Sequence, residues 1–224
     1  MHDLSEYVQY RCIVGSRAYG LADQGSDTDL RGFYLPPARL HWSLRKLPEQ
    51  LENVERQECF WELEKLLKLA LESNPNVLEC LNTPLIQHVS PLASDLLAMR
   101  SAFHSKLAYA KYSRYAEQQF GRLSAAREKG DPTNWKHAMH MLRLMIAGTH
   151  LLRYGEVLVD VSEFRERLLE VKRGKVSWGE VEAWRSALQS QLDSAYMFTE
   201  LPEKPDREAV DAFLIGARMS MADA

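Results

Sequence analysis

The stretch Gly15-Ser16-Arg17-Ala18-Tyr19-Gly20, followed closely by Ser26-Asp27-Thr28-Asp29, decides the fold and the chemistry that we expect of this chain. An apolar run leads into the glycine-serine turn, and a second apolar run follows the acidic pair, as is typical of two β-strands. Residues two apart on a strand share a face, with α-carbons roughly 6.6–6.8 Å apart. We therefore expect Asp27 and Asp29 to point the same way, beside a tight turn.

The turn has the residue types that bind phosphate. Gly15 lets the backbone approach a ligand closely and adopt a positive φ. Ser16 offers a hydroxyl and a backbone N–H to phosphate oxygens, and Arg17 can pair with phosphate through two N–H groups at once. A Gly-Ser dipeptide also occurs in ordinary turns. The acidic pair is therefore needed to distinguish a phosphate-binding turn from an ordinary one.

The acidic pair indicates a divalent cation. Aspartate is disfavoured in strands, and two aspartates on one face repel each other, so a compensating charge is expected. Magnesium binds carboxylate oxygen and keeps water and substrate phosphates as its other ligands. Two such ions, roughly 3.5–4 Å apart, activate an attacking oxygen and neutralise a leaving one. An exposed turn that ends in a strand is the alternative, but the nearby Gly-Ser turn favours a metal site at Asp27 and Asp29.

Hydrophobic patterns predict an α/β domain at 1–98 and a helical domain at 99–224. Strands are expected at 10–14, 30–35 and 52–60, where the last one is rich in charge. From residue 61 onward the apolar spacing becomes helical. Helices are expected at 63–71, 92–103, 104–129, 134–153, 162–172, 177–199 and 206–219.

Composition limits the class of protein. The 224 residues carry a net charge of −3 and only three scattered cysteines, which predicts a cytoplasmic protein without a disulfide framework. There is no run of 18 apolar residues, so we expect no membrane span. Residues 101–153 hold nine basic and three acidic side chains. This basic segment either attracts phosphates or is a solvated helix face.

Taken together, the motifs resemble a known family. Gly15-Ser16 followed by Asp27-x-Asp29 resembles the nucleotidyltransferase fold of the polymerase-beta superfamily, and the fuller string resembles its RlaP-type branch, which is linked to RNA repair. Segments 74–81, 136–144 and 201–206 also resemble motifs of that branch. The resemblance implies an α+β fold, in which a mixed sheet with flanking helices precedes an all-helical domain. It also implies magnesium and a nucleoside triphosphate.

The superfamily usually supplies a third carboxylate from a later strand. In this chain Glu58 and Glu55 are available there, and no aspartate is present. We prefer Glu58 as the third catalytic carboxylate because it lies nearer the end of the run. Glu55, or no third carboxylate at all, remains the alternative.

Helix 134–153 carries a polar stripe. Lys136, His140 and Arg143 follow steps of four and three residues, which places them on one face. Lys136 and Arg143 suit a triphosphate as a point charge and a planar fork. His140 either orients the acceptor or hydrogen-bonds a neighbouring carbonyl group.

These observations predict a magnesium-dependent nucleotidyltransferase that moves a nucleoside monophosphate from a triphosphate to an acceptor hydroxyl and releases pyrophosphate. An RNA end is the expected acceptor. Transfer to a small molecule or a protein is the first alternative, and a non-catalytic nucleotide-binding or antitoxin-like partner is the second. A homo-oligomer or a protein partner is compatible with the charge pattern.

Overall fold

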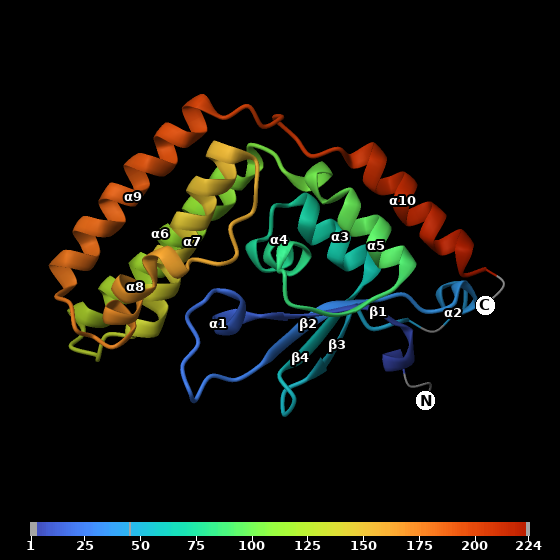
Figure 1. The fold of residues 1–224 in the computed structure, drawn as a ribbon, viewed down its shortest axis with the longest axis horizontal. Helices are drawn as coiled ribbons and strands as arrows, with labels where there is room; N and C mark the ends of the chain where they lie inside the picture. The colour runs from blue at the N-terminus through green and yellow to red at the C-terminus, as the bar shows by residue number, and fades with distance from the viewer. Residues whose placement is uncertain (1–3, 45, 223–224) are drawn as a thin grey trace. The chain divides into compact units, whose positions relative to one another are not determined.

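The computed structural model describes residues 4–44 and 46–222, and Figure 1 shows its fold. The chain forms two compact units. The first comprises the chain up to Phe103 and again from Pro205, and the second is His104–Lys204. This division lies close to the expected boundary at residue 98, but it assigns the last helix to the first unit, whereas the sequence pattern placed it in the helical domain.

The first unit contains a mixed five-stranded sheet in the order β3-β4-β2-β1-β5. Strands β2 and β4 are parallel, and the other neighbours are antiparallel. The strands are β1 (Val8–Val14), β2 (Asp29–Tyr34), β3 (Gln50–Asn53), β4 (Glu58–Glu62) and β5 (Ile86–Val89).

The single strand expected at 52–60 is wrong, because this segment is the β3–β4 hairpin. Asn53 pairs with Glu58 across a turn, and Gln57 has a φ of 54° there. Of the charged residues that weakened the strand pattern, Glu55 and Arg56 lie in this turn, whereas Glu52 and Glu58 belong to the two strands. Strand β5 had no sequence signal, and all four of its residues are exposed at the edge of the sheet.

Helices α3, α4 and α5 lie on one side of this sheet (Figure 1). The apolar side chains of α3 recur at i, i+3, i+4 and i+7, and this face is buried. Strand β1 packs against α4, where the Tyr10 hydroxyl donates to the carbonyl oxygen of Cys80 at 2.9 Å. The helical elements of this unit are η1 (Leu4–Tyr7), α1 (Gly15–Ala18), α2 (Ala38–His41), α3 (Leu63–Leu71), α4 (Pro75–Asn82), α5 (Pro91–Ala98), η2 (Arg100–Phe103) and α10 (Arg207–Ser220).

The second unit is helical, and α7 is its centre. Helix α7 packs against α6, α8 and α9, and most of its side chains are buried. Asn134 caps its start, and Gly155 ends it with a φ of 71°. The elements are α6 (Leu107–Glu128), α7 (Trp135–Tyr154), η3 (Ser162–Phe164), α8 (Arg165–Lys172) and α9 (Trp178–Phe198).

The α+β class is confirmed: a mixed sheet with flanking helices is combined with a helical region. Among the described residues, no helix has both the length and the apolar character that a bilayer crossing requires.

Candidate functional site

The Gly15-Ser16 turn and the acidic segment meet at the first residue of β2. Val14 is the register partner of Asp29, so the end of β1 lies beside the start of β2. Gly15 follows with a φ of 70°, and a Cβ built on it would overlap the carboxylate of Asp29. The Asp29 side chain therefore lies against the α-carbon of Gly15, and a glycine is required there both for its backbone conformation and for space.

Arg17 ties the acidic loop to the turn. Its guanidinium donates to the carbonyl oxygen of Ser26 at 3.0 Å and to that of Asp27 at 3.3 Å. These bonds hold the backbone of the loop next to α1. Arg17 is thus a positioning residue for Asp27, and its direct contact with phosphate stays a prediction.

Asp27 lies in the loop before β2, since the strand begins at Asp29. The alternation of side chains along a strand therefore does not set the direction of Asp27. The Asp23 carboxylate organises this loop by accepting hydrogen bonds from the Gly25 N–H and the Ser26 hydroxyl. The loop and Arg17 together, rather than strand geometry, position Asp27.

Asp29 has a basic neighbour on its own strand. The Arg31 guanidinium lies 3.8 Å from the Asp29 carboxylate and also donates to the carbonyl oxygens of Leu30 and Gln57. Both side chains are about one-third exposed, so this ion pair adds little to stability. Asp29 therefore keeps oxygen atoms within reach of a ligand.

The register of the parallel pair bears on the third carboxylate. Glu58 is the partner of Leu30, whereas Cys59 is the partner of Arg31. Side chains alternate along a strand, so Leu30 and its partner Glu58 point to the face of the sheet opposite Asp29. Glu55 belongs to the turn between β3 and β4. A role as metal ligand stays a prediction for both glutamates, and the register does not support it for Glu58.

The candidate donors at the turn are the carboxylates of Asp27 and Asp29. Within 4–44 and 46–222, no three His, Cys, Asp or Glu side chains gather in a way that could hold a metal ion. Magnesium is commonly held by one or two carboxylates, and substrate phosphates and water complete its coordination. Asp27 and Asp29 fit that pattern in chemical type.

Beneath the turn lies a buried carboxylate from α4. The Tyr19 hydroxyl donates to the Glu79 carboxylate at 2.6 Å, and Glu79 is only 1% exposed. This bond joins the residue that follows α1 to the helix that covers the sheet. This contact gives Glu79 a structural role within the first unit.

The three polar residues expected on one helix do lie on α7, in the second unit. Lys136 is exposed, whereas Arg143 is fully buried and its Nη2 lies 3.4 Å from Nδ1 of His140. Burial, followed by the nearby charge of Arg143, lowers the pKa of His140 to about 3. His140 is thus neutral at physiological pH, and its ring forms a T-shaped pair with Tyr115, with ring centroids 5.8 Å apart. The binding of nucleotide by these three residues stays a prediction.

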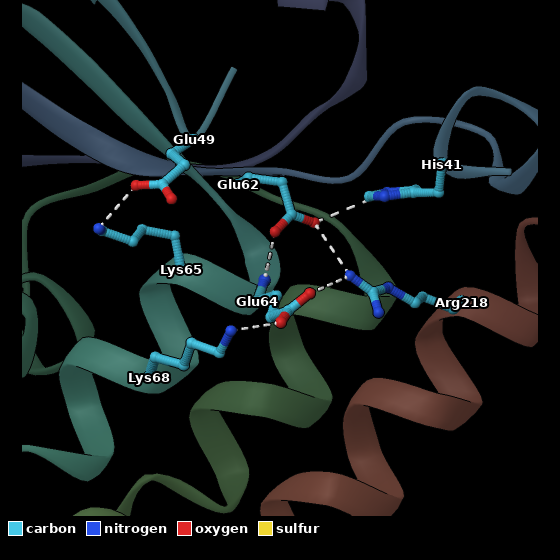
Figure 2. Close-up of polar contacts among 7 residues, drawn as sticks. All are labelled: His41, Glu49, Glu62, Glu64, Lys65, Lys68 and Arg218. Atoms are coloured by element: carbon cyan, nitrogen blue, oxygen red, sulfur yellow. Dashed lines mark hydrogen bonds and ion pairs between the residues drawn. The ribbon is translucent and has the colours of Figure 1, made fainter. Parts of the chain in front are cut away.

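Figure 2 shows a second polar cluster in the first unit, which no sequence pattern predicts. Arg218 of α10 bonds the Glu64 carboxylate at 2.5 Å and lies 4.0 Å from Glu62. Glu62 accepts from the Glu64 N–H and caps α3, and His41 lies 3.7 Å from its other oxygen. Burial raises the pKa of Glu62, and burial together with Arg218 lowers that of His41. The cluster lines a pocket of about 470 Å³ and attaches α10 to α3.

Comparison with known proteins adds a family and one relative. Residues 3–216 match the family described as RlaP, the RNA repair pathway DNA polymerase beta family. The chain is also similar to the uncharacterised protein YcgL of Bacillus subtilis (strain 168), with 26% identity over 155 residues. That match covers 67% of this chain and 58% of YcgL, so the chain spans less than two thirds of the length of this relative. No solved structure matches the chain significantly.

Proposed function

The chain belongs to RlaP, the RNA repair pathway DNA polymerase beta family, and on this premise we propose that it is a magnesium-dependent nucleotidyltransferase. The observation that carries the proposal is the contact between the Asp29 carboxylate and Gly15. It places an anionic oxygen directly against the turn that would bind the triphosphate. A carboxylate next to a phosphate site would repel the substrate unless a cation lay between them.

The residues of the turn account for the binding of the triphosphate. The positive φ of Gly15 shapes the turn whose backbone would meet the β- and γ-phosphates, and Ser16 would donate its hydroxyl to their oxygens. Asp27 and Asp29 would hold the magnesium ions, with Arg17 fixing the loop that carries Asp27. Bound magnesium neutralises phosphate charge and makes pyrophosphate a better leaving group.

In the proposed reaction, the acceptor hydroxyl attacks the α-phosphorus in line with the bond to the bridging oxygen. The new oxygen–phosphorus bond forms, the bond to pyrophosphate breaks, and the hydroxyl proton passes to solvent or to a carboxylate. Most of the rate enhancement then comes from positioning and charge stabilisation. Membership of an RNA repair family supports an RNA end as the acceptor.

A labelling experiment tests this proposal. The protein is incubated with magnesium and with each of ATP, CTP, GTP and UTP labelled at the α-phosphate, together with total RNA or lysate. We expect label in RNA, and we expect it to disappear in Asp27→Asn and Asp29→Asn. Asp23→Asn is the matched control, because it lies in the same loop and asparagine keeps the oxygen that accepts from Gly25 and Ser26. Label in protein or in a small molecule would identify that molecule, rather than RNA, as the acceptor. Labelling by Asp29→Asn at the wild-type level would overturn the proposal.

A further inference from the structure

Helices α6 and α9 of the second unit contact each other through two pairs of arginine and aromatic side chains. The Arg127 guanidinium of α6 lies 4.9 Å from the ring centroid of Trp178 on α9. Seven residues away along each helix, the Arg185 guanidinium of α9 lies 4.1 Å from the ring centroid of Phe120 on α6. The two rings stack on each other, with centroids 5.6 Å apart and planes 10° apart. The contacts thus run in a line from Arg185 through both rings to Arg127.

This arrangement immobilises a guanidinium without neutralising it. An arginine over an aromatic face keeps its full charge, and its N–H groups remain available at the edge of the guanidinium plane. The Arg127 side chain is held further by a hydrogen bond from its Nη1 to the Thr133 hydroxyl at 2.5 Å, and Arg127 remains exposed. Arg127 is therefore a preorganised cation on the surface.

Two basic turns meet beside it. Arg127 and Lys129 end α6, and Arg173 and Lys175 lie between α8 and α9, just before Trp178. A Cβ on Gly174 would lie 2.8 Å from the indole nitrogen of Trp135, which begins α7. The turn after α8 is therefore packed against the start of α7, while Arg127 contacts the start of α9. We call the four exposed cations Arg127, Lys129, Arg173 and Lys175 the basic end.

The acidic residues nearby leave an excess of positive charge. Glu128 and Asp131 lie in the first turn, and no Asp or Glu lies between 171 and 179. The Glu180 carboxylate is directed to the start of α9, where it accepts from the Ser177 N–H and hydroxyl. Glu180 keeps its negative charge in these hydrogen bonds, so the four cations of the basic end face three carboxylates, and Glu170 and Lys172 at the end of α8 add one charge of each sign.

We propose that the basic end binds the phosphate backbone of a nucleic acid. Each of the two rings already contacts a guanidinium and the other ring, so recognition falls to the cations rather than to base stacking on Phe120 or Trp178. Binding is therefore independent of base sequence and strongly dependent on salt. That the bound strand is the RNA acceptor rests on the proposed function, whereas phosphate binding by this surface does not.

The test is an equilibrium titration of the full chain with a labelled single-stranded RNA, over a range of salt concentrations. The variant Lys129→Gln/Lys175→Gln removes two cations in exposed turns, away from the arginine–aromatic stack. Each lost phosphate contact lowers the salt slope by about 0.7 on single strands, so the pair should lower it by about 1.4. If the two proteins bind equally at 1 M salt, this slope difference makes binding at 0.1 M roughly 25-fold weaker in the variant.

Arg114→Gln is the matched control. Arg114 is an exposed cation on the same helix, 13 residues before Arg127 and therefore about 20 Å away along the axis. We expect it to leave the slope almost unchanged. Arg127→Lys keeps the charge but loses the planar group, and it should weaken binding without changing the slope.

Two further comparisons identify the ligand, and one active-site variant distinguishes this inference from the proposed function. RNA and DNA of one sequence show which strand is preferred, and a change of base sequence should leave the affinity unchanged. Asp29→Asn should retain RNA binding while it loses nucleotide transfer. An equal loss in the Lys129/Lys175 variant and in Arg114→Gln would overturn the inference. Binding of polyglutamate as tightly as RNA would also overturn it.

Discussion

The carboxylate of Asp29 lies against the α-carbon of Gly15, at a position that a Cβ on residue 15 would occupy. This contact joins the turn after β1 to the start of β2, and it follows from the register in which Val14 pairs with Asp29. The proposed site therefore depends on the absence of a side chain at residue 15 as much as on the presence of the carboxylate.

Gly15→Ala should disrupt the site. A left-handed backbone costs a residue with a Cβ about 1–2 kcal/mol, and the new methyl group must also displace Asp29. We expect nucleotide transfer to fall at least as far as in Asp29→Asn, with a moderate loss of stability in urea denaturation. Gly25→Ala is the control in the same loop, because its Cβ would meet only the Asp23 carboxylate, at 3.9 Å. Normal transfer by Gly15→Ala would show that the contact has no role.

Removal of the Tyr19 hydroxyl should destabilise the first unit. Tyr19→Phe loses a bond to the buried Glu79 carboxylate, and a hydrogen bond to a charged group contributes about 1.5–3 kcal/mol. The free energy of unfolding, measured with urea, should fall by that amount. Tyr154→Phe serves for comparison, since that ring is 65% exposed. Equal stability of the two variants would argue against an anchoring role for Tyr19.

Glu62 should make the stability of the first unit depend on pH. Burial raises the pKa of this carboxyl above its ordinary value of 4.5, so the unfolded chain releases the proton at a lower pH than the folded chain. Its contribution is full below about pH 4.5 and is lost as the pH rises through the folded pKa. Relative to Glu62→Gln, which keeps an acceptor for the Glu64 N–H, the wild type should lose stability as the pH rises above 4.5.

Denaturation of both proteins across this pH range measures the effect. Glu52→Gln, at an exposed residue of β3, corrects for the general loss of one carboxylate. A difference between wild type and Glu62→Gln that grows in favour of the wild type as the pH rises would contradict the prediction.

His140 should remain neutral at every pH near neutrality. Burial and the charge of Arg143 lower its pKa to about 3, compared with 6.5 in an unfolded chain. The folded state therefore gains stability from His140 above pH 6.5 and loses it as the pH falls toward 3. In NMR spectra, the imidazole signal that disappears in His140→Gln should show no titration between pH 5 and 8. A midpoint near 6.5 would mean that the ring is solvated.

The sequence predicts the parts of this structure that depend on local patterns. Strand β1, strand β2 and the long helices follow from apolar spacing, and the Gly15 turn follows from its residue types. The β3–β4 hairpin was missed because its charged turn looks like a weak strand. Strand β5 was missed because it is an exposed edge without alternation.

Tertiary contacts set the remaining features. The bond between Glu64 and Arg218 joins residues 154 apart, and nothing near either residue in sequence indicates it. The same contact explains why α10 packs in the first unit rather than with the helices that precede it. Likewise, the position of Glu58 relative to Asp29 depends on the register between β2 and β4, which cannot be read from a single segment.

The proposed activity requires that Asp27 and Asp29 hold the divalent ion of a bound nucleotide. Titration of Mn²⁺, followed by electron paramagnetic resonance with a non-hydrolysable triphosphate present, measures this directly in the full chain. We predict that the wild type binds the metal–nucleotide complex and that Asp29→Asn binds it at least about tenfold more weakly, because a carboxylate ligand to a hard cation has been removed. Asp23→Asn should bind as the wild type does. Equal affinity of the wild type and Asp29→Asn would contradict the account.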